Sequence, residues 1–133
     1  MIPVYQRGKT DCVRACVAAI LEIPYEEVPD FDINKLNVEM PPFFAKHGLG
    51  IVNMSLDGGD AIPDGVPAGY TLGGLNPRTE GEIGHSVICK DGYIVFDPYP
   101  YMNWYMSERR RPDQYTFIYS LDPSLKVRQL TGD

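Results

Sequence analysis

The first long segment with a hydrophobic pattern covers residues 11–23 (DCVRACVAAILEI). After its first residue the only charged positions are Arg14 and Glu22, which lie eight residues apart and so share nearly one stripe of a helix. A helix that is apolar on almost every other side is a buried one. Asp11 is a favourable N-cap and Pro24 stops the pattern. We therefore predict that residues 11–23 form the central helix of the fold.

Two weaker helical segments follow. Residues 24–31 (PYEEVPDF) suggest a short acidic turn of helix, and residues 32–47 suggest a second helix. Pro41 and Pro42 interrupt that second pattern and favour two pieces, the latter beginning near Pro42. Gly48 is suited to ending the helix, since it tolerates a left-handed backbone.

The second half of the chain changes to the alternating pattern of β-strands. A hairpin is the clearest signal, because HSVICK and YIVFD flank the turn pair Asp-Gly. The other expected segments are strands at 51–56, 67–72 and 115–121, a loop at 73–84, and a tail of uncertain order at 122–133. Helices first and antiparallel strands afterwards define an α+β fold.

Composition limits the protein class. The chain has 133 residues, 44% of them hydrophobic, and a net charge of −6. This length fits a single domain over residues 1–133 with its own core. The acidic balance argues against nucleic-acid binding, which needs surplus Lys and Arg. No segment predicts a membrane span or a signal peptide, so we expect a cytoplasmic protein. Three cysteines suit free thiols better than disulfides.

Cys12 is the first candidate for chemistry. It is expected in the first helical turn, where unpaired N–H groups and the helix dipole favour a thiolate over a thiol. The Asp11 carboxylate opposes this unless it is engaged in capping the helix. The simpler alternative is that Cys12 is a small hydrophobic residue at the top of a buried helix.

His85 and Asp97 bracket the predicted hairpin, and its register decides whether they meet. A two-residue turn at 91–92 would oppose His85 to Pro98 and turn Asp97 to the other face. A three-residue loop at 90–92, with Gly in the left-handed bulge position, would pair His85 directly with Asp97. A function that needs both side chains therefore predicts the three-residue loop.

A cysteine at a helix N-terminus, with histidine and aspartate on adjacent strands, matches the roles of nucleophile, general base and orienting group. Gln6 adds a side-chain amide six residues before the thiol. This amide could turn back and donate to an oxyanion beside the backbone N–H of Cys12.

These residues resemble the papain-like cysteine peptidases. The shared motifs are Gln6 five residues ahead of Asp11-Cys12, then Gly84-His85-Ser86-Val87, then Asp97-Pro98, in that order. The resemblance covers about residues 3–100 and is nearest to the bacteriocin-processing (double-glycine leader) peptidases, here as a stand-alone domain. It departs from them at Val13, where that branch usually has glycine, and we expect a domain without the downstream transporter of that branch.

The resemblance implies a papain-like fold, with the helix that carries Cys12 packed on a small antiparallel sheet. It also implies roles for four residues. Gln6 would be the oxyanion residue, Cys12 the nucleophile, His85 the general base and Asp97 its orienting group.

The aromatic residues after Asp97 have two interpretations. Tyr99, Tyr101 and Trp104 could pack under a loop as a satellite cluster. They could equally form an apolar wall for substrate beside the base, since a chain leaving Asp97 must start near the site.

Metal binding by the cysteines and His85 is disfavoured. His85 and Cys89 are four residues apart on a predicted strand, about 13 Å, too far to share one ion. Cys16 and Cys89 are better explained as core residues. We expect neither metal nor cofactor.

The sequence thus predicts a cysteine hydrolase that cleaves an amide bond in a peptide or protein. Two other functions stay open. The same residues could serve an acyl transferase or deamidase, or the domain could be a catalytically silent module that binds a peptide.

Overall fold

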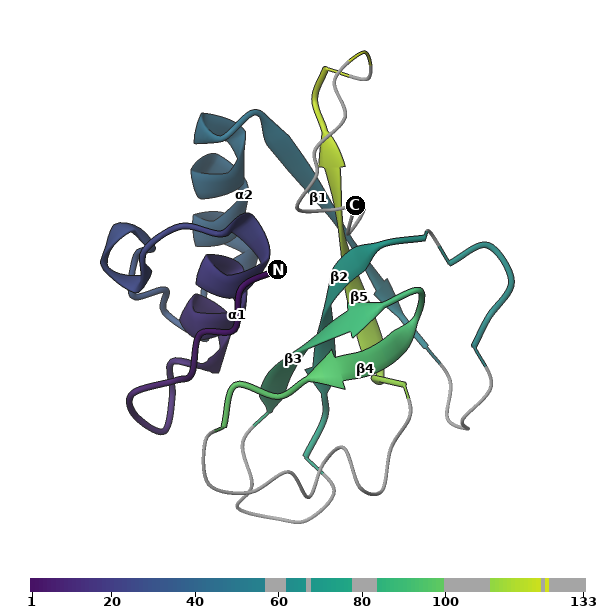
Figure 1. Cartoon of the computed structure of the whole chain (residues 1–133), viewed down its shortest axis with the longest axis horizontal. Helices are drawn as coiled ribbons and strands as arrows, with labels where there is room; N and C mark the ends of the chain where they lie inside the picture. The colour runs from purple at the N-terminus through teal and green to yellow at the C-terminus, as the bar shows by residue number, and fades with distance from the viewer. Residues whose placement is uncertain (57–61, 67, 78–83, 100–110, 123, 125–133) are drawn as a thin grey trace.

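The structure is a computed structural model that describes residues 1–56, 62–66, 68–77, 84–99, 111–122 and 124. Within them the fold is α+β, as the sequence predicts, with the helices on one side of a twisted antiparallel sheet (Figure 1). The elements are α1 (Cys12–Leu21), the 3-10 helix η1 (Tyr25–Glu27), α2 (Leu36–Lys46), β1 (Leu49–Ser55), β2 (Tyr70–Leu75), β3 (His85–Lys90), β4 (Tyr93–Phe96) and β5 (Gln114–Ser120).

Helix α1 is the buried centre of the molecule, as its pattern predicts. Nine of its ten residues are buried, and it packs mainly against β3. It ends two residues earlier than predicted, because Glu22 adopts a left-handed conformation with φ 57°. The N-terminal arm lies along it, with the backbone N–H of Ile2 donating to the carbonyl of Ala19 at 3.0 Å.

Helix α2 corrects the expected break at the prolines, because one continuous helix runs from Leu36 to Lys46 through both of them. Pro41 and Pro42 each remove one intrahelical hydrogen bond. Both lie on the exposed side of the helix. Water can therefore satisfy the carbonyls that they leave unpaired. Gly48 follows with φ +73°, in the role predicted for it.

The described strands form one sheet in the order β1-β5-β2-β3-β4. The last strand, β5, therefore lies between β1 and β2 and pairs with both. This placement corrects the prediction of a strand at 67–72 and a loop at 73–84. Strand β2 runs from Tyr70 to Leu75, because Gly73 and Gly74 pair with β3 on one side and β5 on the other.

The β3–β4 hairpin has neither of the two registers considered from the sequence. Lys90 pairs with Tyr93, so the turn has two residues, Asp91 at φ 53° and Gly92 at φ 92°. The three-residue loop is therefore wrong. A bulge follows, since Cys89 pairs with Ile94 and Ile88 with Phe96, which leaves Val95 as an extra residue. That residue shifts the alternation and turns Asp97 to the same face as His85.

The two faces of the sheet have separate cores. The face toward the helices packs Leu72, Ile88, Phe96 and Ile118 against α1 and α2. The other face gathers Leu75, Val87, Cys89 and Tyr115. None of the helices in the described part of the chain has the length and apolar character needed to cross a membrane.

Candidate active site

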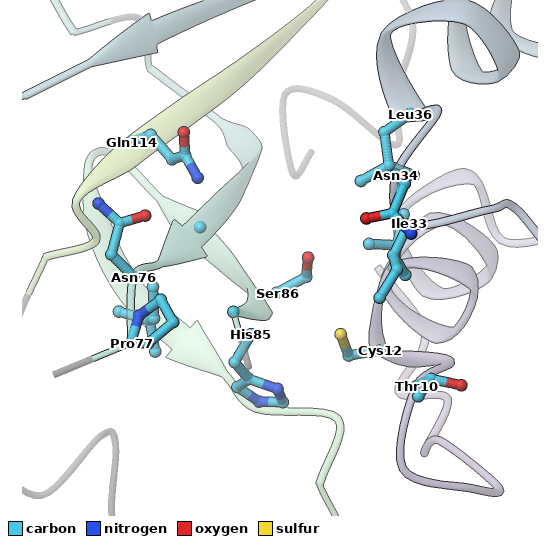
Figure 2. A pocket seen from close by; sticks show the side chains of 14 residues that line it. Thr10, Cys12, Ile33, Asn34, Leu36, Asn76, Pro77, His85, Ser86 and Gln114 are labelled. Atoms are coloured by element: carbon cyan, nitrogen blue, oxygen red, sulfur yellow. The ribbon is translucent and has the colours of Figure 1, made fainter. Parts of the chain in front are cut away.

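Cys12 and His85 meet where the N-terminus of α1 faces the beginning of β3 (Figure 2). Cys12 is the first residue of α1, as predicted, and only 6% of it is exposed. Burial alone would raise the pKa of its thiol. Hydrogen bonds from His85 and from the backbone and side chain of Ser86, with the charge of His85, outweigh burial and lower this pKa. The site therefore favours a thiolate.

His85 is held between Cys12 and a buried carboxylate. Its Nε2 lies 2.7 Å from Oδ1 of Asp97, and the two side chains are 10% and 0% exposed. Burial lowers the pKa of His85, but the hydrogen bonds and charges of Asp97 and Cys12 raise it to about 9. The raised imidazole pKa and the lowered thiol pKa both favour a thiolate–imidazolium pair, and Asp97 stabilises the positive member of that pair.

Asp97 is fixed by its own backbone surroundings as well as by His85. Its Oδ1 also accepts a hydrogen bond from the backbone N–H of Tyr99 at 2.9 Å. With Nε2 of His85 engaged by Asp97, Nδ1 is the ring nitrogen that remains for the thiol. The proton on each ring nitrogen is thus set by the partner it faces.

Asp11 corrects one prediction. It occupies the N-cap position of α1, but its side chain makes no cap hydrogen bond. Its carboxylate instead accepts the backbone N–H groups of Arg7 and Gly8, at 2.7 and 2.9 Å, and the hydroxyl of Tyr25 at 2.6 Å. The guanidinium groups of Arg7 and Arg14 each lie 4.0 Å from the Tyr25 ring. Asp11 therefore braces the loop that precedes Cys12.

Gln6 is buried in that same loop. Its backbone N–H donates to the carbonyl of Pro98 at 2.9 Å, which ties the loop to the residue after Asp97. Its side-chain Nε2 donates to the carbonyl of Gly8 at 2.8 Å. Its Oε1 is buried and has no hydrogen-bond partner among the described residues. The oxyanion role of Gln6 stays a prediction.

Ser86 is a site residue that the sequence reasoning missed. Its backbone and hydroxyl both contact the Cys12 sulfur. The alternation of side chains along the strand was the available signal, because the residue after His85 must face the other side of the sheet. At this end of β3 that side is turned toward α1. Ser86 also lines a cavity of about 360 Å³ that opens at Cys12 and His85.

The other two cysteines are core residues, as expected. Cys16 and Cys89 are fully buried free thiols. Burial raises the pKa of Cys89 to about 12 and, together with nearby negative charge, raises that of Cys16 well above its usual value. Of the three aromatic candidates, Tyr99 contacts Asp97 as described above. Tyr101 and Trp104 lie outside the described residues.

Comparison with known proteins adds no relative. No protein-family model matches this chain, and no curated protein matches it either. Its function is therefore inferred from the fold and from the geometry around Cys12.

Proposed function

We propose that this protein is a thiol hydrolase of the papain-like class that cleaves an amide bond in a peptide or protein. The observation that carries the proposal is the chain of contacts from Cys12 through His85 to Asp97, with Nε2 of His85 2.7 Å from a fully buried Asp97 carboxylate. A nucleophile, a base and an orienting group in hydrogen-bonding contact are the requirements for nucleophilic acyl transfer.

The reaction follows from the protonation states. The thiolate of Cys12 attacks the carbonyl carbon, and its oxygen becomes an oxyanion near the N-terminus of α1 and Gln6. The C–N bond breaks as His85 gives its proton to the leaving amine, which leaves a thioester on Cys12. Water then attacks the thioester and loses a proton to His85. The acid product departs, and the thiolate–imidazolium pair is restored.

The proposal also covers the cofactor, the partner and the cellular compartment. Cys12 supplies the nucleophile, His85 carries the protons, and water completes the hydrolysis, so the reaction as proposed uses no cofactor. The partner is its peptide or protein substrate, and we place the protein in the cytoplasm.

The test is the alkylation rate of each thiol by iodoacetamide against pH, resolved by mass spectrometry. Cys12 should react at least about tenfold faster than a thiol of ordinary pKa near pH 7. Cys16 and Cys89 are internal controls, because both are fully buried. Equal inertness of all three thiols in the folded protein would overturn the proposal.

Turnover supplies the second arm of the test. Cys12→Ala should abolish hydrolysis of a peptide pool, a loss of more than about 10³-fold, while the thermal unfolding midpoint stays close to that of the wild type. Wild-type turnover in this variant would contradict the mechanism. Adding an amine acceptor distinguishes hydrolysis from acyl transfer, because a transferase would form a new amide with the amine.

A further inference from the structure

The face of the sheet that meets the helices changes character near Cys12. Ser86 of β3 pairs with Gly74 of β2, Gly74 with Gln114 of β5, and Gln114 with Ser55 of β1. These four residues form one row across four strands. In the row two residues further along, Leu72 and Ile88 belong to the core, while the same row continues on β5 and β1 as Thr116 and Asn53, whose side chains share an exposed hydrogen bond. On β2 and β3 the apolar face thus ends in a row of small and polar residues.

This polar row is the floor of a groove that starts at the nucleophile. The cavity at Cys12 and His85 adjoins a second one of about 560 Å³. The two share Val13, Leu36, Gly74, Ser86 and Gln114, so they form one continuous groove. Its opposite wall comes from the start of α2 and the residues before it, as Figure 2 shows for Ile33, Asn34 and Leu36.

Apart from His85, the described residues that line the groove carry no charged side chain. Among the described residues that line the two cavities there is no Asp, Glu, Lys or Arg, although these make up 23% of the chain. Five carboxamides line it instead: Asn34, Asn37, Asn53, Asn76 and Gln114. A carboxamide both donates and accepts hydrogen bonds, as a peptide backbone does. A charged substrate side chain would lose its hydration there without gaining a counter-charge.

Gln114 holds the central position. A Cβ added to Gly74 would lie 2.6 Å from Cγ and Nε2 of Gln114, so this side chain lies directly over the glycine. The absent side chain of Gly74 therefore makes room for the amide of Gln114. The amide is placed at the point where the two cavities join.

The groove also has a direction relative to the reaction. His85 protonates the leaving amine, so the leaving group must lie beside the imidazole. From the thiol the groove extends past Ser86 and Gly74 into the second cavity, which neither Cys12 nor His85 lines. The acyl portion of the substrate, which precedes the scissile bond, is the part that can occupy it.

We propose that the groove binds an extended, uncharged peptide segment on the acyl side of the scissile bond, and that Gln114 is a specificity-determining residue that reads its backbone. This rests on the proposed function for the identity of the nucleophile. The groove is then selective against Lys and Glu in that segment.

The test uses tripeptidyl chloromethyl ketones of one length, which the Cys12 thiolate alkylates by displacing chloride. One probe is Ala-Ala-Ala, and three others carry Asn, Lys or Glu at the middle position. Each rate is divided by the iodoacetamide rate of the same variant, which reports the thiolate alone. The Ala and Asn probes should label at least about tenfold faster than the Lys and Glu probes, a difference of about 1.4 kcal/mol.

Gln114→Glu sharpens the test because it introduces one negative charge into the groove. The normalised rate of the Lys probe should rise about tenfold relative to that of the Glu probe. Val52→Glu is the matched control. Val52 is 52% exposed on β1 and faces the other side of the sheet, so the same charge there should leave the probe ratios unchanged.

The outcomes separate the groove from the catalytic proposal. If iodoacetamide selects Cys12 but charged and neutral probes label equally, the groove proposal fails while the thiolate stands. The groove proposal also fails if Gln114→Glu and Val52→Glu give the same ratios. If iodoacetamide does not select Cys12, the proposed function fails. The groove is then judged by fluorescence polarisation of the matching labelled peptide amides on Cys12→Ala, where equal binding of charged and neutral peptides overturns it.

Discussion

Cys12 and Cys16 lie one turn apart on α1, and their surroundings shift their pKa values in opposite directions. Burial raises the pKa of both thiols. At Cys12 the hydrogen bonds and positive charge supplied by β3 overcome burial, whereas the charges that reach Cys16 are negative and add to it. The same helix therefore contains a thiol suited to nucleophilic attack and a thiol suited to packing. The difference comes from the partner strand and is absent from the helix sequence.

The substitution His85→Ala is expected to have the largest effect, because it should give the Cys12 thiol a raised pKa like that of Cys16. In His85→Ala burial remains while the main cause of the low pKa is lost, so the pKa of Cys12 rises. Alkylation near pH 7 should fall about tenfold for each pKa unit, and turnover about 10²–10⁴-fold. Site-resolved alkylation against pH measures this.

His85→Gln is the control for the vacancy that alanine leaves. Glutamine keeps a hydrogen-bond partner for the buried Asp97 carboxylate but does not titrate. It should slow Cys12 as alanine does, with a smaller loss of stability. An unchanged pH profile in both variants would show that His85 does not set the thiol pKa.

Asp97→Asn should have the next largest effect, through His85. The substitution keeps a hydrogen-bond acceptor but removes the negative charge, so the pKa of His85 falls from about 9 toward its ordinary 6.5. The leaving amine needs a protonated His85, so activity is lost as pH rises through this pKa. The alkaline limb of kcat/KM should therefore move to lower pH, and kcat should fall about 10²–10⁴-fold.

NMR titration of the imidazoles measures the same shift directly. The chain has only two histidines, so the signal that is missing from the spectrum of His85→Ala is assigned to His85. The wild-type His85 signal should titrate near pH 9 and that of Asp97→Asn at lower pH. A His85 titration that does not differ between the two proteins would contradict the role given to Asp97.

The same contrast separates what the sequence predicts from what it does not. The position of Cys12 in a helical first turn follows from local patterning, since Arg14, Glu22 and Pro24 define the helix. The insertion of β5 between β1 and β2 does not follow, because strand order depends on pairings between distant segments. Gln114 of β5 was missed as a site residue for that reason, whereas Ser86 follows His85 on the same strand and could have been found from the alternation of that strand.

The hairpin is the instructive intermediate case. The sequence analysis predicted that His85 and Asp97 share one face of the hairpin, but it attributed this to a three-residue loop. The structure reaches the same contact with a two-residue turn and an extra residue at Val95. Asp-Gly favours the tight turn locally. A bulge on an edge strand leaves no comparable mark in the sequence.

Tyr25→Phe tests the smallest contribution to the environment of Cys12, the brace of its preceding loop. The variant loses the 2.6 Å hydrogen bond to Asp11 but keeps the ring between Arg7 and Arg14. Tyr25 is partly exposed, so the free energy of unfolding should fall by only about 1 kcal/mol. Burial raises the pKa of the Asp11 carboxyl, but the hydrogen bonds from Tyr25 and from the backbone N–H groups of the loop outweigh burial and lower this pKa. A carboxyl whose pKa is lowered by folding stabilises the folded state at pH values above its ordinary pKa of 3.8. This stabilisation is lost as the pH falls through the folded-state pKa. The difference in unfolding free energy between the variant and the wild type, measured by denaturant unfolding, should therefore be full at pH 7 and shrink below pH 3.8.

Tyr119→Phe is the control, because it removes the same atom from an exposed residue of β5. It should lower the free energy of unfolding by less at every pH. Equal losses in the two variants would show that the brace adds nothing beyond the hydroxyl itself.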